Sequence, residues 1–229
     1  MKKIHVILII LLIVAADQAL KIYVKTHFQL NDSHNVMGNW FKLYFVENPG
    51  MAYGWKFGGD WGKFALTVFR LGAVIFGTFY LGSIIRKKYS RGFILCASLI
   101  YAGALGNLID SAFYGMIFDK GTMNDLDGYF GLATLHFSGK GYASFLHGSV
   151  VDMLYFPLIK GSFPKWFPFW GGDPFEFFRP IFNLADASIS TGVISIIIFQ
   201  KRIIRNKEHA GDHATVETTA IVNDESQVS

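Results

Sequence analysis

Cysteine is almost missing from this sequence. Cys96 is the only one in 229 residues, so no disulfide can form within the chain. Cys96 lies in an apolar run, where a small buried hydrophobe is a simpler interpretation than a nucleophile. No His-Glu-x-x-His spacing occurs, and the seven histidines are scattered singly, so no zinc site is indicated. The sequence therefore predicts neither a metal nor another cofactor.

Charged residues are also scarce. They make up 17% of the chain, whereas 52% of the residues are hydrophobic and the mean hydropathy is +0.33. An ordinary soluble domain is less apolar. The formal net charge of +4 could suggest nucleic acid as a partner, but the basic residues cluster at the ends of apolar runs. That distribution is typical of membrane topology, so we expect an integral membrane protein and no nucleic acid.

Four apolar runs are long enough to cross a bilayer as helices. They cover about residues 4–24, 64–85, 93–118 and 183–204. The first run could be a cleavable signal peptide, but it resumes after Asp17 and reaches Val24, which favours a retained helix. Residues 25–63 and 119–182 are then two loops on one side of the membrane. We expect residues 1–205 to form one membrane domain and residues 206–229 a disordered tail.

The distribution of lysine and arginine predicts the orientation of the chain in the membrane. Lys2-Lys3, residues 86–91 and residues 201–207 are basic and fall on one side, which the positive-inside rule makes cytoplasmic. Both termini should be cytoplasmic and both loops external. Residues 40–46 of the first loop alternate as a short strand does. The many aromatic residues between 163 and 178 predict an element in the phospholipid headgroup region, with a self-packed loop as the alternative.

Polar residues interrupt the apolar segments near the expected outer face. They are Asp17, Lys21, Asn107, Asp110, Asp152, Asn183 and Asp186. Asn107 and Asp110 are three residues apart, as are Asn183 and Asp186, so each pair shares one helical face. Asp17 and Lys21 can pair at i and i+4, and this pair could be purely structural. Ionisable groups at membrane depth are functional candidates by default.

Two carboxylates in one site cannot both ionise easily, so their proton affinities separate. One then activates a water while its protonated partner donates to a carbonyl, which is aspartic peptide hydrolysis. We expect Asp152 and Asp186 to be this pair. The residues alone leave two alternatives open: a proton-coupled transporter, which needs acids near the midplane, and a structural polar cluster. Ser149 lies near Asp152 in sequence, but no spacing indicates a Ser–Lys pair.

Five segments together resemble the sequence boxes of the lipoprotein signal peptidases, the type II signal peptidases of bacterial inner membranes. The segments are Asp17-Gln18-Ala19-Leu20-Lys21, Glu47-Asn48-Pro49-Gly50-Met51-Ala52, Gly103-Ala104-Leu105-Gly106-Asn107-Leu108-Ile109-Asp110, Val150-Val151-Asp152 and Phe182-Asn183-Leu184-Ala185-Asp186. One box is a weak signal, but five in order on four spans are a strong one.

The resemblance implies a membrane α-helical fold with four transmembrane helices, a small extracytoplasmic β-cradle and an interfacial aromatic-rich loop or helix. It implies an aspartic endopeptidase, without a metal, that removes the signal peptide from diacylglyceryl-modified prolipoproteins before the lipidated cysteine. The catalytic pair would be Asp152 and Asp186, at the extracytoplasmic face. The substrate-binding or supporting residues would be Asn48, Gly50, Asn107, Asp110, Asn183, Asp17 and Lys21, although Asn48 could equally be a turn former.

The sequence departs from the family pattern at two places. Ser111 stands where the family commonly has an arginine after its Gly-Asn-x-x-Asp segment, and Arg70 or Arg179 would have to replace that charge. The segment between Asp110 and Asp152 is also longer than the family leads us to expect.

Overall fold

The computed structural model describes residues 1–49, 59–119, 131–136, 141–177 and 180–203. Its helices are α1 (Lys3–His27), α2 (Gly59–Arg86), α3 (Arg91–Ile109), the π-helix η2 (Asp110–Tyr114), α4 (Gly115–Ile117) and α5 (Leu184–Ile203). Its strands are β1 (Ser33–Met37), β2 (Phe41–Asn48), β3 (Val150–Tyr155), β4 (Ile159–Ser162), β5 (Pro174–Phe177) and β6 (Ile181–Phe182). Gly50, Arg179 and the predicted tail lie outside the described residues.

Among the described residues, three helices are long and apolar enough to cross a membrane, namely Lys3–His27, Trp61–Arg86 and Arg91–Ile117. They cover the first three predicted spans, and the apolar part of α5, Leu184–Gln200, is shorter. Large hydrophobic side chains point outward from these helices: Phe69, Phe76 and Phe79 of α2 are 72%, 69% and 73% exposed. Such a surface is stable only in an apolar solvent, so the fold is that of a helical membrane protein.

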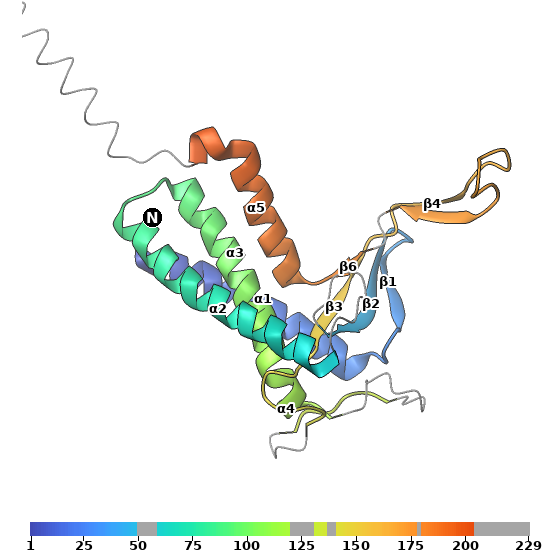
Figure 1. Cartoon of the computed structure of the whole chain (residues 1–229), viewed down its shortest axis with the longest axis horizontal. Coiled ribbons are helices and arrows are strands. Elements are labelled where there is room, and N and C mark those ends of the chain that lie inside the picture. Colours follow the sequence, from blue (N-terminus) through green and yellow to red (C-terminus); the bar gives the residue numbers. More distant parts are fainter. Residues whose placement is uncertain (50–58, 120–130, 137–140, 178–179, 204–229) are drawn as a thin grey trace, which may run out of the picture.

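Helix α3 contacts α1, α2 and α5 and therefore holds the helices together (Figure 1). Two glycines allow the close approach. A Cβ on Gly103 would come within 2.2 Å of the Ala185 carbonyl oxygen, and one on Gly106 within 2.7 Å of Asp17 Oδ2. The starting turn of α5 and the middle of α1 thus pack directly on α3. This contact brings the polar residues of three helices to one place.

The predicted third span is not a regular helix to its end. We expected one continuous helix over residues 93–118, but the chain changes to a π-helix at Asp110. The loop before β3 donates hydrogen bonds to two carbonyl groups of this segment. Gly148 N–H donates to Ser111 O at 2.8 Å, and Leu146 N–H donates to Ala112 O at 3.1 Å. Turns of this kind are frequent at functional sites, because they change the direction of the side chains that follow.

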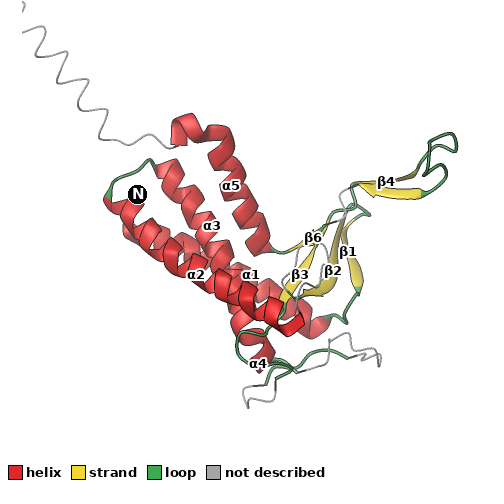
Figure 2. Ribbon diagram, in the orientation of Figure 1, coloured by secondary structure: helices red, strands yellow, loops and turns green. Residues whose placement is uncertain are grey.

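A four-stranded antiparallel sheet, in the order β1-β2-β3-β6, lies at the end of the helices far from the N-terminus (Figures 1 and 2). Strand β2 confirms the strand predicted over residues 40–46. The pairing of β2 with β3 sets Val46 opposite Asp152 and Asn48 opposite Val150. Strand β6 pairs with β3 and leads directly into α5. The sheet therefore joins the segment that carries Asp152 to the beginning of α5.

Strands β4 and β5 form a separate hairpin that projects away from the helices (Figure 1). Its turn carries three aromatic side chains, Trp166, Phe169 and Trp170, which are 79%, 96% and 56% exposed. The resemblance implied a helix or a loop for this aromatic segment. Within the described residues 141–177 it is a hairpin, so the helix is wrong and the loop is the better description.

Candidate active site

Asp152 lies in β3 and is 4% exposed. Its Oδ1 accepts a hydrogen bond from Asn183 Nδ2 at 2.7 Å, and its Oδ2 accepts one from Asn48 Nδ2 at 3.2 Å. Burial raises the pKa of Asp152 to about 7, and the negative charge of Asp186 is the second cause of that rise. The two hydrogen bonds oppose the rise because they stabilise the anion. Asp152 can therefore hold a proton near neutral pH.

Asp186 lies in the first turn of α5, where the helix dipole favours an anion. Its Oδ1 accepts from Asn107 Nδ2 at 2.7 Å. Asn183, directly before the helix, completes a reciprocal cap: its Oδ1 accepts from Asp186 N–H at 2.8 Å, while its own N–H points to Asp186 Oδ2 at 3.4 Å. This is a capping box built from Asn and Asp. The Asn-x-x-Asp spacing thus fixes the direction of the Asp186 carboxylate.

Asn183 links the two carboxylates. Its side-chain amide donates to Asp152, its amide oxygen and backbone N–H engage Asp186, and it is completely buried. The structure therefore brings Asp152 and Asp186 together around one asparagine, although 34 residues separate them in sequence. Asn107 closes the arrangement from α3, since it contacts Asp186 and also accepts from Asn183 Nδ2 at 3.1 Å.

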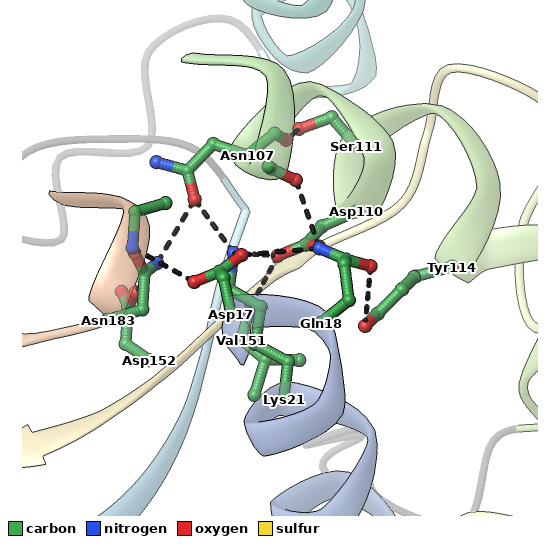
Figure 3. Close-up of polar contacts among 12 residues, drawn as sticks. Asp17, Gln18, Lys21, Asn107, Asp110, Ser111, Tyr114, Val151, Asp152 and Asn183 are labelled. Atoms are coloured by element: carbon green, nitrogen blue, oxygen red, sulfur yellow. Dashed lines mark hydrogen bonds and ion pairs between the residues drawn. The ribbon is translucent and has the colours of Figure 1, made fainter. Parts of the chain in front are cut away.

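A buried lysine lies at the centre of the neighbouring polar network (Figure 3). Lys21 Nζ is 2.8 Å from Asp17 Oδ2, 2.7 Å from Asp110 Oδ2 and 2.9 Å from Asn107 Oδ1. Lys21, Asp17 and Asp110 are each at most 1% exposed. Asp17 Oδ1 also accepts the Ala185 N–H at 2.9 Å, in the first turn of α5. The predicted Asp17–Lys21 pair is present, and it joins α1 to α3 and α5.

Asp110 is a member of this network, and among the described residues its hydrogen bonds and ion pair go to residues other than Arg70. Besides Lys21, it accepts from Gln18 Nε2 at 2.8 Å and from the backbone N–H of Val151 at 3.4 Å (Figure 3). Arg70 Nη1 instead donates to Ser111 Oγ at 2.7 Å. The guanidinium from α2 therefore reaches the position after Asp110, where the resemblance leads us to expect an arginine.

Several residues of the site were missed from the sequence. Tyr114 donates to Gln18 Oε1 at 3.1 Å and so supports the amide that contacts Asp110. Lys25 forms a buried ion pair with Glu47, and its Nζ lies 5.1 Å from the centres of the Phe118 and Tyr142 rings. Gln18, Lys21 and Lys25 lie on one face of α1, at spacings of three and four residues. This spacing is the sequence feature from which a polar face of α1 could have been predicted.

The structure brings together a serine and a lysine that no sequence spacing indicated. Lys63 Nζ donates to Ser149 Oγ at 3.3 Å, across 86 residues of sequence. Ser149 is 5% exposed, and its backbone N–H donates to Tyr142 Oη at 2.7 Å. A serine hydroxyl beside a lysine amine is a possible nucleophile, so Ser149 is a chemical rival to the aspartates. In the described part of the chain, no three His, Cys, Asp or Glu side chains are grouped to hold a metal ion.

Fold and site together define a helical membrane protein whose buried carboxylates gather in one polar cluster among α1, α3, α5 and the sheet. The family model described as signal peptidase (SPase) II matches residues 9–201. The chain belongs to this family of proteases, which confirms the resemblance seen in its five boxes.

Individual relatives are consistent with this family membership. The lipoprotein signal peptidase of Porphyromonas gingivalis is 47% identical over 197 residues, which cover 86% of this chain and 82% of the relative. That of Amoebophilus asiaticus is 37% identical over 198 residues, with coverages of 85% and 76%. A bacterial membrane enzyme solved by the in meso method has a TM-score of 0.53 at 26% identity, and the match covers 86% of this chain and 93% of that one.

Proposed function

We propose that this protein removes the signal peptide from diacylglyceryl-modified prolipoproteins by cutting on the N-terminal side of the lipidated cysteine. Family membership and the relatives named lipoprotein signal peptidase support this substrate class. The lipid on the substrate confines the peptide to the membrane plane. The enzyme then needs only to orient a chain that is already at the correct depth.

The proposed mechanism is aspartic, with Asp152 and Asp186 as the catalytic residues. The observation that carries it is the contact of Asn183 with both carboxylates. Asp186, favoured as an anion at the helix start, takes a proton from a water whose oxygen attacks the scissile carbonyl carbon. Asp152, protonated near neutral pH because its pKa is raised to about 7, donates to the carbonyl oxygen. The C–N bond then breaks: the leaving nitrogen takes the proton held by Asp186, and a hydroxyl of the intermediate returns its proton to Asp152 as the new carboxyl group forms.

The other site residues would position this pair. Asn48, Asn107 and Asn183 donate to the two carboxylates and fix their direction. Lys21 forms ion pairs with both Asp17 and Asp110, and this network holds the start of α5 against α1 and α3. Burial of the whole cluster excludes bulk water, which strengthens each charge interaction. Gly50 remains a predicted substrate-binding residue.

The proposed setting is the bacterial inner membrane. We infer that α5 is the fourth span, since its apolar part of about 26 Å approaches the thickness of the hydrocarbon core. Residues 1–205 then form one domain with both termini in the cytoplasm, and the four-stranded sheet is an extracytoplasmic cradle. The exposed rings of the β4–β5 turn would lie among phospholipid headgroups, where Trp is enriched.

Two rival functions remain testable. A proton-coupled transporter would use the same carboxylates, but it needs acids near the bilayer midplane. The described carboxylates of this site lie at the junction of α3 with η2, in the first turn of α5 and in the C-terminal half of α1, which places them toward the sheet and away from the N-terminal end of α1. The 3.3 Å contact between Lys63 and Ser149 favours the second rival, a Ser–Lys peptidase.

Cleavage of a defined substrate tests the proposal. The purified full chain is mixed with a prolipoprotein that carries diacylglycerol on its cysteine, and the products are identified by mass spectrometry. The expected product begins with the lipidated cysteine. Its absence, or a cut elsewhere, contradicts the proposal. The unlipidated substrate is the matched control, and it should be cut much more slowly because nothing confines it to the membrane plane.

A further inference from the structure

A cavity lies at the N-terminal end of α1, away from the acidic site. Its volume is about 580 Å³, and its lining residues come from the beginning of α1, the end of α2 and the connection to α3. Figure 1 shows these three segments at the same end of the helices. The lining residues are Met1, Lys2, His5, Ile85, Lys88, Tyr89 and Arg91. None of them belongs to the acidic site or to its supporting network.

The charge around this cavity is of one sign. Lys2, Lys88 and Arg91 are exposed, and in the part of the chain that the structure describes they form no ion pair. The sequence contains no Asp or Glu in residues 1–16 or 61–109, ranges that include this end of the three helices. Three cations around one cavity repel one another, and a bound anion would remove that repulsion. The start of α3 at Arg91 adds the positive end of a helix dipole.

One of these cations, Lys88, stands at the backbone position that ends α2. Lys88 has a φ of 53°, and the bonds Lys88 N–H to Ile85 O at 3.2 Å and Tyr89 N–H to Ile84 O at 3.1 Å form a Schellman motif at the end of α2. Glycine is the usual residue at this position, since it adopts a positive φ without strain. Lys88 therefore adopts a left-handed backbone conformation that is unfavourable for a residue with a side chain.

The cavity also has an apolar side. Met1, Ile85 and Tyr89 pack against the buried cluster that includes Ile84 and Phe93, and the Tyr89 and Phe93 rings are 5.4 Å apart. Cations above an apolar wall, at the end of membrane helices, match an amphiphile with a negative head. We propose that this cavity binds the phosphate headgroup of an anionic membrane phospholipid, with the first part of its acyl chains against Ile85 and Tyr89. Basic pockets between transmembrane helices bind such headgroups.

Native mass spectrometry of the full chain in detergent tests this site. The protein is mixed with equal amounts of phosphatidylglycerol and phosphatidylethanolamine, and the lipids that stay bound are counted. The wild type should prefer phosphatidylglycerol. A variant with Lys2→Gln, Lys88→Gly and Arg91→Gln should lose this preference by about 100-fold, at about 5-fold for each cation near an anionic headgroup. No preference in the wild type would overturn the proposal.

A matched control separates the cavity from general positive charge. Lys3→Gln, Arg86→Gln and Lys87→Gln remove three exposed cations from the same end, but these residues do not line the cavity. This variant should keep the preference. An equal loss in both variants means that the surface charge acts and the cavity does not. If the triple cavity variant fails to fold, Lys88→Gly alone suits the backbone and should weaken the preference about 5-fold.

Glycerol phosphate distinguishes a lipid from a soluble phosphate. It carries the same anion without acyl chains, so at equal concentration it should not displace phosphatidylglycerol. Displacement would show that the apolar wall contributes nothing and would overturn the lipid assignment. The readout counts bound lipid and does not depend on peptide cleavage, so this proposal and the proposed function fail independently.

Discussion

Replacing Lys21 by methionine tests the network that supports the site. Methionine has a similar length, but it leaves Asp17 and Asp110 as buried carboxylates without their cation, which lies 2.8 and 2.7 Å away. Breaking a buried ion pair by removing one partner costs about 3–5 kcal/mol. Because Lys21 serves two carboxylates, we expect about 4 kcal/mol, or roughly a thousand-fold in the ratio of folded to unfolded protein. Cleavage should also fall, since Lys21 contacts Asn107, which contacts Asp186.

The assay is reversible unfolding in mixed micelles, followed by far-ultraviolet circular dichroism. Lys3→Met is the matched control: it is the same substitution on the same helix, but at an exposed position, and it should change stability by less than about 0.5 kcal/mol. The double variant Lys21→Met with Asp110→Asn removes one unpaired charge and should recover about 1–3 kcal/mol. If Lys21→Met costs no more than Lys3→Met, the buried network does not stabilise the protein.

Three further predictions concern the site and its setting. Asp110→Asn should lower cleavage partly and Asp110→Ala should lower both cleavage and stability, because Asp110 supports the site; an inactive but folded Asp110→Asn would assign it to the catalytic pair. Cleavage should decline above about pH 7 as Asp152 loses its proton. Asn48→Ala should move this decline to higher pH, because the hydrogen bond that it removes stabilises the Asp152 anion. An unchanged pH profile contradicts the role of Asn48 in setting the pKa of Asp152. A reporter fused after Lys201 should be cytoplasmic and one inserted near Gly139 external, and the reverse would put the site on the wrong face.

Much of the helical frame could be predicted from the sequence, because apolar runs of membrane length leave few alternatives. The Asn-x-x-Asp spacings predicted shared helical faces, and for Asn183 and Asp186 the structure gives the reason, a reciprocal helix cap. The break at Asp110 could not be predicted. It depends on backbone groups of Leu146 and Gly148, more than 30 residues further along the chain.

The contacts that could not be predicted from the sequence are mainly those between residues far apart along the chain. Lys63 and Ser149 are 86 residues apart, and no spacing indicates that α2 passes beside the loop before β3. Arg70 and Ser111 meet for the same reason, through the packing of α2 on α3. Lys25 and Glu47 are closer in sequence, but their pairing depends on the position of β2 against α1. Local patterns describe faces of elements, and only tertiary packing decides which faces meet.

The most direct measurement of the central claim compares three purified variants on the same lipidated prolipoprotein. Asp152→Asn and Asp186→Asn keep the size of each side chain but remove the proton exchange on which the mechanism depends, so both should remain folded and lose cleavage. Ser149→Ala removes the rival nucleophile and should retain substantial cleavage. Folded aspartate variants that still cut, or a Ser149→Ala protein that does not, would contradict the account.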